Sequence, residues 1–99
     1  MASETVRVVA KLTAQPDKVE DLKSILLSVV GPTCKEKGCV SYQLLQNKTD
    51  ASDFVFVEEW TSDAAIDSHM TTSHVQDALA KIESMLAQEP DIRRYVIIG

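Results

Sequence analysis

The sequence contains few of the residues that mark irregular or cross-linked proteins. Its 99 residues include only three glycines, three prolines and two cysteines. So little glycine and proline excludes a low-complexity or disordered chain, and the hydrophobic fraction of 44% is that of an ordinary globular domain. Four residues separate Cys34 from Cys39, which is neither a zinc-type pair nor a disulfide framework, so we expect both thiols to stay reduced.

Basic charge and long apolar runs are also scarce. Ten lysines and arginines face fifteen acidic residues, for a formal net charge of -5, whereas proteins that bind nucleic acid are normally basic on one face. No apolar stretch approaches the roughly 20 residues that cross a bilayer, and the first residues lack the basic flank and apolar segment of a secretory signal. We therefore predict a single domain over residues 1–99, cytoplasmic, with no nucleic-acid partner and no membrane segment.

The first third of the chain predicts a strand followed by a helix. Residues 5–13 are rich in β-branched types and alternate in the manner of a strand. A helix then begins at Pro16, and its apolar residues recur at three-and-four spacing. We expect this helix to end near Pro32, with Lys37 as the alternative end, and Gly38 to stop it.

The remaining strand signals lie in three segments. Residues 39–46 and 53–60 are rich in β-branched and aromatic types, and the polar residues 47–52 between them suit a hairpin connection. Val40, Tyr42 and Leu44 are expected on one side of the first of these strands. The tail, residues 92–98, predicts a fourth strand.

Two helices are expected between the third and the fourth strand. Ser62 suits the cap of a short helix that is interrupted at residues 71–73. Ser73 and Gln76 have the spacing of a capping box for the helix that follows. That helix should end by Gln88, because a proline comes shortly after it.

The order of elements is strand, helix, strand, strand, helix pair, strand. This is the βαββαβ arrangement of ferredoxin-like α+β domains, in which helices cover one face of an antiparallel sheet. The strands carry apolar residues on the other face too, among them Val55 and Val57. We therefore predict a homodimer with sheet against sheet, and a ligand-filled open face is the alternative.

The third strand places a carboxylate among aromatic rings. A period of two puts Phe54, Phe56, Glu58 and Trp60 on one side. Two roles are open for Glu58: a general acid or base with a raised pKa, and a structural carboxylate paired with an arginine. Strand parity alone does not decide whether Glu58 or Glu59 is the buried carboxylate. Trp60 either walls a pocket and offers its N–H to a substrate or anchors the core.

The two histidines are the other candidates for chemistry. His69 and His74 lie five positions apart, about 140° around a continuous helix, so a shared metal ion is not expected. A break at residues 71–73 would let both rings turn toward one pocket beside Trp60, with His69 as a base. His74 lies either in that pocket or at the surface, and Tyr42 either projects into the cavity or packs within the sheet.

The segment Phe54–His74 (FVFVEEWTSDAAIDSHMTTSH) resembles the signature of the antibiotic biosynthesis monooxygenase family. The shared features are Glu-x-Trp, the Ser-x-x-Ala that follows and two spaced histidines. The opening strand and helix and the segment Gly38–Tyr42 are similar to the family as well. The resemblance implies a dimeric α+β barrel. It also implies an activity, because characterised members of the family oxygenate quinols, anthrones or related phenols with O₂ and without a flavin, metal or other prosthetic group.

The implied activity is a cofactor-independent monooxygenase that takes a small aromatic substrate and O₂. A base removes a phenolic proton, the anion reduces O₂, and an apolar pocket excludes water. The expected catalytic residues are His69 or Glu58 as base, with Trp60 as pocket wall. The expected substrate contacts are Phe54, Phe56, Tyr42, Met70 and His74.

Two alternatives remain open from the sequence. A dimeric binding or stress-related module would hold a small apolar ligand without turnover. A haem-binding or haem-degrading protein would use His69 as the axial ligand. The haem-degrading branch of the family also has an asparagine on the first strand, and residues 5–13 contain none.

Overall fold

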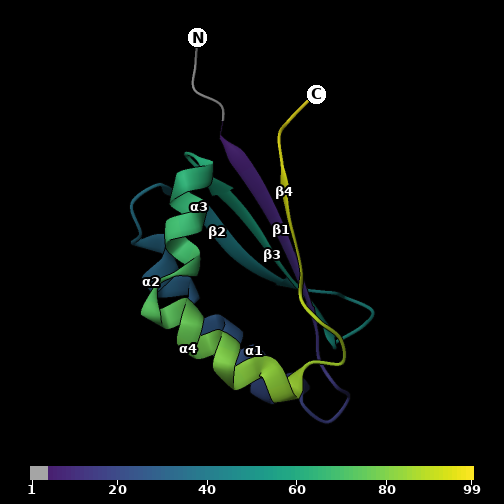
Figure 1. Ribbon diagram of the computed structural model, residues 1–99. Helices are drawn as coiled ribbons and strands as arrows, with labels where there is room; N and C mark the ends of the chain where they lie inside the picture. The colour runs from purple at the N-terminus through teal and green to yellow at the C-terminus, as the bar shows by residue number, and fades with distance from the viewer. Residues whose placement is uncertain (1–4) are drawn as a thin grey trace.

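The computed structural model describes residues 5–99 and consists of a four-stranded antiparallel sheet with helices on one face (Figure 1). The sheet order is β2-β3-β1-β4, formed by β1 (Val6–Thr13), β2 (Cys39–Gln46), β3 (Asp53–Trp60) and β4 (Asp91–Tyr95). The helices are α1 (Val19–Ser28), α2 (Val30–Cys34), α3 (Asp63–Met70), α4 (Ser73–Ile82) and the 3₁₀ helix η1 (Glu83–Met85). The predicted ferredoxin-like α+β fold is confirmed.

The predicted first helix is divided into two. Residues 16–17 form a turn and Lys18 is the N-cap, so α1 begins at Val19, three residues later than expected, and ends at Ser28. Pro32 does not end the helix but lies in the first turn of α2, where its missing N–H has no carbonyl to bond. Gly38 ends the segment as predicted, with a φ of 92° that favours glycine.

Strand β3 has the predicted alternation. Phe54, Phe56, Glu58 and Trp60 are buried against the helices, whereas the residues between them are half-buried on the other face. Glu59 belongs to that second face, where it accepts a hydrogen bond from Thr5 at 2.8 Å. The buried carboxylate is therefore Glu58.

Strand β2 departs from the predicted alternation at its start. Its pairing with β3 is irregular between Cys39 and Ser41, which shifts the register there. Tyr42 and Leu44 still pack toward the core, but Val40 is 52% exposed. The prediction that Val40 shares their face is wrong, because the irregularity falls between Cys39 and Ser41.

The caps of the two later helices agree only in part with expectation. Ser62 caps α3 as predicted, its hydroxyl accepting a hydrogen bond from the Ala65 N–H at 3.1 Å. The capping box predicted at Ser73 is wrong, because the cap of α4 is Thr72, whose hydroxyl accepts from the Val75 N–H at 3.4 Å. Ser73 is the first residue inside the helix.

The last part of the chain is shorter in regular structure than predicted. Helix α4 ends at Ile82 and η1 at Met85, after which Leu86 pairs with Ala14 as an isolated bridge. The prediction that the helix ends by Gln88 is confirmed, and the bridge draws the chain toward the end of β1. Strand β4 has all its residues exposed and ends at Tyr95, short of residue 98.

The face of the sheet that lacks helices presents an apolar patch. Val9 on β1 pairs with Val57 on β3, and Leu45 on β2 pairs with Val55 on β3. Val9 and Leu45 are 37% and 48% exposed. The predicted sheet-to-sheet homodimer would bury this patch and stays a prediction. None of the described helices combines the length and apolarity needed to cross a membrane.

Candidate functional site

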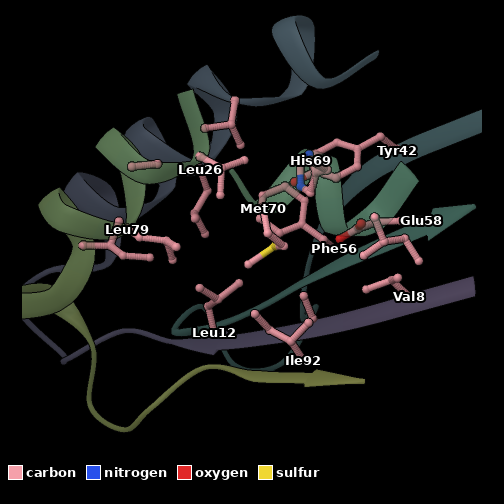
Figure 2. Close-up of a pocket in the computed structure, with 16 residues that line it drawn as sticks. Val8, Leu12, Leu26, Tyr42, Phe56, Glu58, His69, Met70, Leu79 and Ile92 are labelled. Atoms are coloured by element: carbon pink, nitrogen blue, oxygen red, sulfur yellow. The ribbon is translucent and has the colours of Figure 1, made fainter. Parts of the chain in front are cut away.

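An apolar cavity of about 70 Å³ lies between the helices and the sheet (Figure 2). Its walls come from the sheet and from α1, α3 and α4, and only three of its side chains are polar: Tyr42, Glu58 and His69. Figure 2 shows these three together at one end, with Leu26 and Leu79 toward the other. The cavity therefore has a polar end and an apolar body.

Glu58 is the carboxylate of the polar end. It is 6% exposed, and its Oε1 accepts a hydrogen bond from Trp60 Nε1 at 2.8 Å. Burial raises the pKa of Glu58 to about 7, against the lowering effect of the Trp60 hydrogen bond. The three arginines pair elsewhere: Arg7 with Glu59, Arg93 with Asp91, and Arg94 with Asp63 and Asp67. The alternative of a Glu58–arginine pair is thus not what the structure shows.

Trp60 and Phe54 lie outside the cavity wall. Both side chains are fully buried, and neither is among the residues that line the cavity. The indole packs against the ring of His69, with centroids 4.7 Å apart, and its N–H is engaged by Glu58. Trp60 is therefore a core anchor that holds Glu58, and the expectation that it walls the pocket is wrong because its indole is fully buried against His69 and Glu58 and does not reach the cavity.

Tyr42, Phe56 and Met70 line the cavity as expected. The rings of Tyr42 and Phe56 are tilted, with centroids 4.9 Å apart, and Tyr42 meets His69 edge-on at 5.7 Å. Burial raises the pKa of Tyr42 well above its ordinary value. Tyr42 therefore presents a neutral hydroxyl group.

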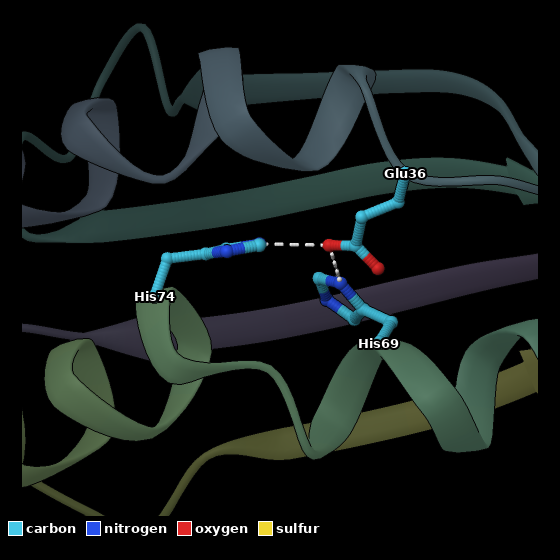
Figure 3. A group of neighbouring side chains, drawn as sticks. All are labelled: Glu36, His69 and His74. Carbon is cyan, nitrogen blue, oxygen red and sulfur yellow. Dashed lines mark hydrogen bonds and ion pairs between the residues drawn. The ribbon is translucent and has the colours of Figure 1, made fainter.

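The two histidines converge on a third residue, Glu36 (Figure 3). Oε2 of Glu36 lies 2.8 Å from Nδ1 of His69 and 2.7 Å from Nε2 of His74. The five-residue spacing does not separate the rings, because His69 lies on α3 and His74 on α4. His74 does not line the cavity, so the rings meet at Glu36 and not at a pocket beside Trp60.

Glu36 fixes the orientation of His69. Because a carboxylate oxygen only accepts hydrogen bonds, Nδ1 of His69 carries the proton of this contact. The other ring nitrogen, Nε2, makes no hydrogen bond within residues 5–99 and keeps a lone pair in the neutral ring. The sequence offered no signal for Glu36, which stands between two lysines in a polar turn after α2.

Comparison with known proteins now places this geometry in a family. Residues 5–81 match the family described as antibiotic biosynthesis monooxygenase. The chain belongs to this family. The match includes α3 and α4 up to Lys81, and with them all the residues of the polar end of the cavity.

Individual proteins are similar to this chain over most or all of its length. YcnE of Bacillus subtilis is 31% identical over 85 residues, which cover 86% of this chain and 90% of YcnE. The protein sll1783 of Synechocystis is 29% identical over 96 residues, which cover 97% of this chain but only 65% of that protein. The solved structure of PA3566 from Pseudomonas aeruginosa is 30% identical, covers 100% of this chain and 99% of that one, and superposes with a TM-score of 0.93.

Proposed function

We propose that this chain is a monooxygenase that oxidises a quinol, an anthrone or a related aromatic phenol with O₂ and needs no prosthetic group. The observation that carries the proposal is a buried carboxylate, Glu58, beside an imidazole, His69, at the polar end of an apolar cavity. Family membership supports the reaction class. YcnE of Bacillus subtilis and Rv0793 of Mycobacterium tuberculosis are provisionally named monooxygenases.

Glu58 is the base in this proposal. A pKa of about 7 makes it a stronger base than an ordinary carboxylate and leaves it substantially ionised near neutral pH. Trp60 holds Oε1, so Oε2 is the oxygen that takes the phenolic proton. The phenolate then gives an electron to O₂, and the two radicals combine to form a carbon–oxygen bond, which leaves a peroxide on that carbon. Loss of the hydrogen on the same carbon as a proton breaks the O–O bond and leaves a carbonyl oxygen in the product. The other oxygen leaves as water with that proton and the one that Glu58 returns.

His69 orients the substrate in this proposal, and Glu36 acts through it. With its Nδ1 proton held by Glu36, the ring offers the Nε2 lone pair to a substrate hydroxyl group. Glu36 touches neither the cavity nor the substrate and is a positioning residue. The apolar remainder of the wall keeps water away from the charged intermediates.

The size of the cavity predicts that it widens when substrate binds. An engineered apolar cavity that accepts benzene measures roughly 150 Å³, about twice the 70 Å³ found here. A second hollow of about 540 Å³ shares Leu79, Ile82 and Ile92 with the cavity. Ile92, on the exposed strand β4, is 45% exposed. We therefore propose that substrate enters between α4 and β4.

The test is oxygen consumption by flavin-free, metal-stripped protein with menadiol or an anthrone, measured above spontaneous autoxidation. Glu58→Gln should lower turnover by about 10²-fold or more, since it removes the base. Glu59→Gln is the matched control, because it changes the neighbouring carboxylate on the opposite face of the sheet. No uptake by the wild type, or equal loss in the two variants, would exclude the proposal.

A small-ligand-binding module without turnover is the second candidate, favoured by the almost entirely apolar lining of the cavity. It predicts that an apolar ligand raises the melting temperature of the wild type and of Glu58→Gln alike, with no oxygen consumed. No observation in the described chain favours haem, the third expectation.

A further inference from the structure

We propose that Glu36, His69 and His74 form a binding site for a divalent transition-metal ion such as Zn²⁺ or Co²⁺. The site lies behind the cavity wall, and the reaction proposed above does not use the ion, since it takes His69 with its proton on Nδ1. An ion on Nδ1 would leave the proton of the neutral ring on Nε2, so His69 would then donate a hydrogen bond to the cavity instead of accepting one. The role of the site is structural, because it would join the turn after α2 to both α3 and α4.

The three ligand atoms already have nearly the spacing that such an ion requires (Figure 3). They all lie within 4.8 Å of one another, and the Glu36 oxygen is 2.8 and 2.7 Å from the two ring nitrogens. Bonds of roughly 2.0–2.2 Å in a tetrahedral arrangement separate ligand atoms by roughly 3.3–3.5 Å. Binding of the ion would replace the two hydrogen-bonding protons. It would move the Glu36 oxygen outward from each ring nitrogen by several tenths of an ångström and bring the two ring nitrogens, now up to 4.8 Å apart, about 1 Å closer together.

The donor set selects a class of ion. Two imidazole nitrogens and one carboxylate oxygen suit Zn²⁺, Co²⁺ and Fe²⁺, whereas Mg²⁺ and Ca²⁺ prefer oxygen ligands throughout. Three protein ligands leave a fourth position for water. Within residues 5–99, Glu36 forms no ion pair with a lysine or arginine, so no side-chain cation competes for its charge.

The surrounding structure holds the ligands in place. The side chains of His69 and Glu36 are 5% and 13% exposed, and that of His74 is 24% exposed, which gives the ion a way in. The Thr72 hydroxyl donates to the His69 carbonyl at 2.8 Å and caps α4, which fixes the short connection between the two helices. Both imidazoles are thus presented to Glu36 before any ion binds.

The test is titration of metal-free wild-type protein with Co²⁺, followed by visible absorption and by equilibrium dialysis. We expect one ion per chain, an absorption band typical of four- or five-coordinate Co²⁺, and displacement by Zn²⁺. Glu36→Gln and His74→Ala should each weaken binding at least tenfold. Co²⁺ should raise the melting temperature of the wild type and not that of the two variants.

Two controls separate this site from other ligands. Glu59→Gln changes a carboxylate on the far face of the sheet, and the double variant Cys34→Ser, Cys39→Ser removes both thiols; both should bind Co²⁺ as the wild type does. The proposal is overturned if the wild type shows no saturable binding, if His74→Ala binds normally, or if the thiol variant loses the band. Because His74 is only half-buried, its variant carries the test should Glu36→Gln not fold.

Discussion

Glu58 illustrates how position within the fold changes the acidity of a single carboxyl group. Burial raises its pKa from an ordinary 4.5 to about 7. The folded state therefore binds this proton more tightly than the unfolded chain does. The stabilisation from Glu58 is fully present below about pH 4.5 and is lost as the pH rises through about 7.

Glu58→Gln should remove this pH dependence. The shift corresponds to about 3 kcal/mol of free energy of unfolding between pH 4 and pH 8. The free energy of unfolding can be measured with urea at both pH values. Between pH 4 and pH 8, the difference in this free energy between Glu58→Gln and the wild type should shift by about 3 kcal/mol in favour of the variant. Glu59→Gln should change with pH as the wild type does, and an identical response of Glu58→Gln would contradict the burial argument.

Trp60→Phe should raise the pKa of Glu58 further. The indole N–H stabilises the ionised carboxylate and so lowers its pKa, an effect that a phenyl ring lacks. If Glu58 is the base, the midpoint of the kcat/KM profile should move up by about one pH unit. Phe54→Leu perturbs the same core without touching Glu58 and should leave the midpoint in place; equal shifts would mean that packing and not the hydrogen bond is responsible.

Single residues of the site were predictable where a strand carried them. The period of two on β3 predicted that Phe56, Glu58 and Trp60 share one face. It brought Glu58 and Trp60 close together, but it did not predict the hydrogen bond between them. Glu36 was not predictable, because it reaches His69 and His74 only through packing of the turn after α2 against α3 and α4. No local pattern encodes that contact.

Among the elements, the connection between α2 and β2 depends most on one residue type. Gly38 has a φ of 92°, and a Cβ on it would lie 2.6 Å from Ala65 Cβ and 2.9 Å from Thr61 Oγ1. Its carbonyl also accepts a hydrogen bond from the Thr61 N–H at 2.9 Å. Gly38 therefore sets the distance between this turn, which carries Glu36, and the start of α3.

Gly38→Ala should destabilise the fold by about 2–4 kcal/mol, because it adds steric overlap to an unfavourable φ. Gly31→Ala is the matched control. Gly31 lies within α2, and apart from its chain neighbours and the backbone of its own helix no atom lies within 4 Å of the place that an alanine methyl group would take. The helix propensity of alanine is offset by the crowding of its Cβ against Pro32, so the change should stay within about 0.5 kcal/mol. Denaturant unfolding would measure both changes, and a Gly38 variant as stable as the wild type would contradict the close approach.

The elements themselves were predictable to within a few residues, because alternation and three-and-four spacing reflect a single buried face. What failed were features set by partners elsewhere in the chain. The irregularity after Cys39, for example, depends on pairing with β3. Periodicity within one segment does not report such contacts.

For the whole molecule, the apolar patch on the face without helices leads us to propose a homodimer. Val57→Asp should reduce the mass in solution from twice that of the chain to that of one chain, because it buries a charge at the proposed interface. Light scattering after size-exclusion chromatography measures this mass. Leu27→Asp, at a 53% exposed position on α1, should stay dimeric; a monomeric wild type would refute the dimer.

The order of the strands also bears on how the chain folds. β1 comes first in the sequence but lies inside the sheet, where its partners are β3 and β4. The hairpin β2–β3 can form early, since only six residues connect its strands. β1 must then close long loops to join β3 and finally β4. We expect the hairpin to become protected from hydrogen exchange first during refolding, and the β1–β4 pair last.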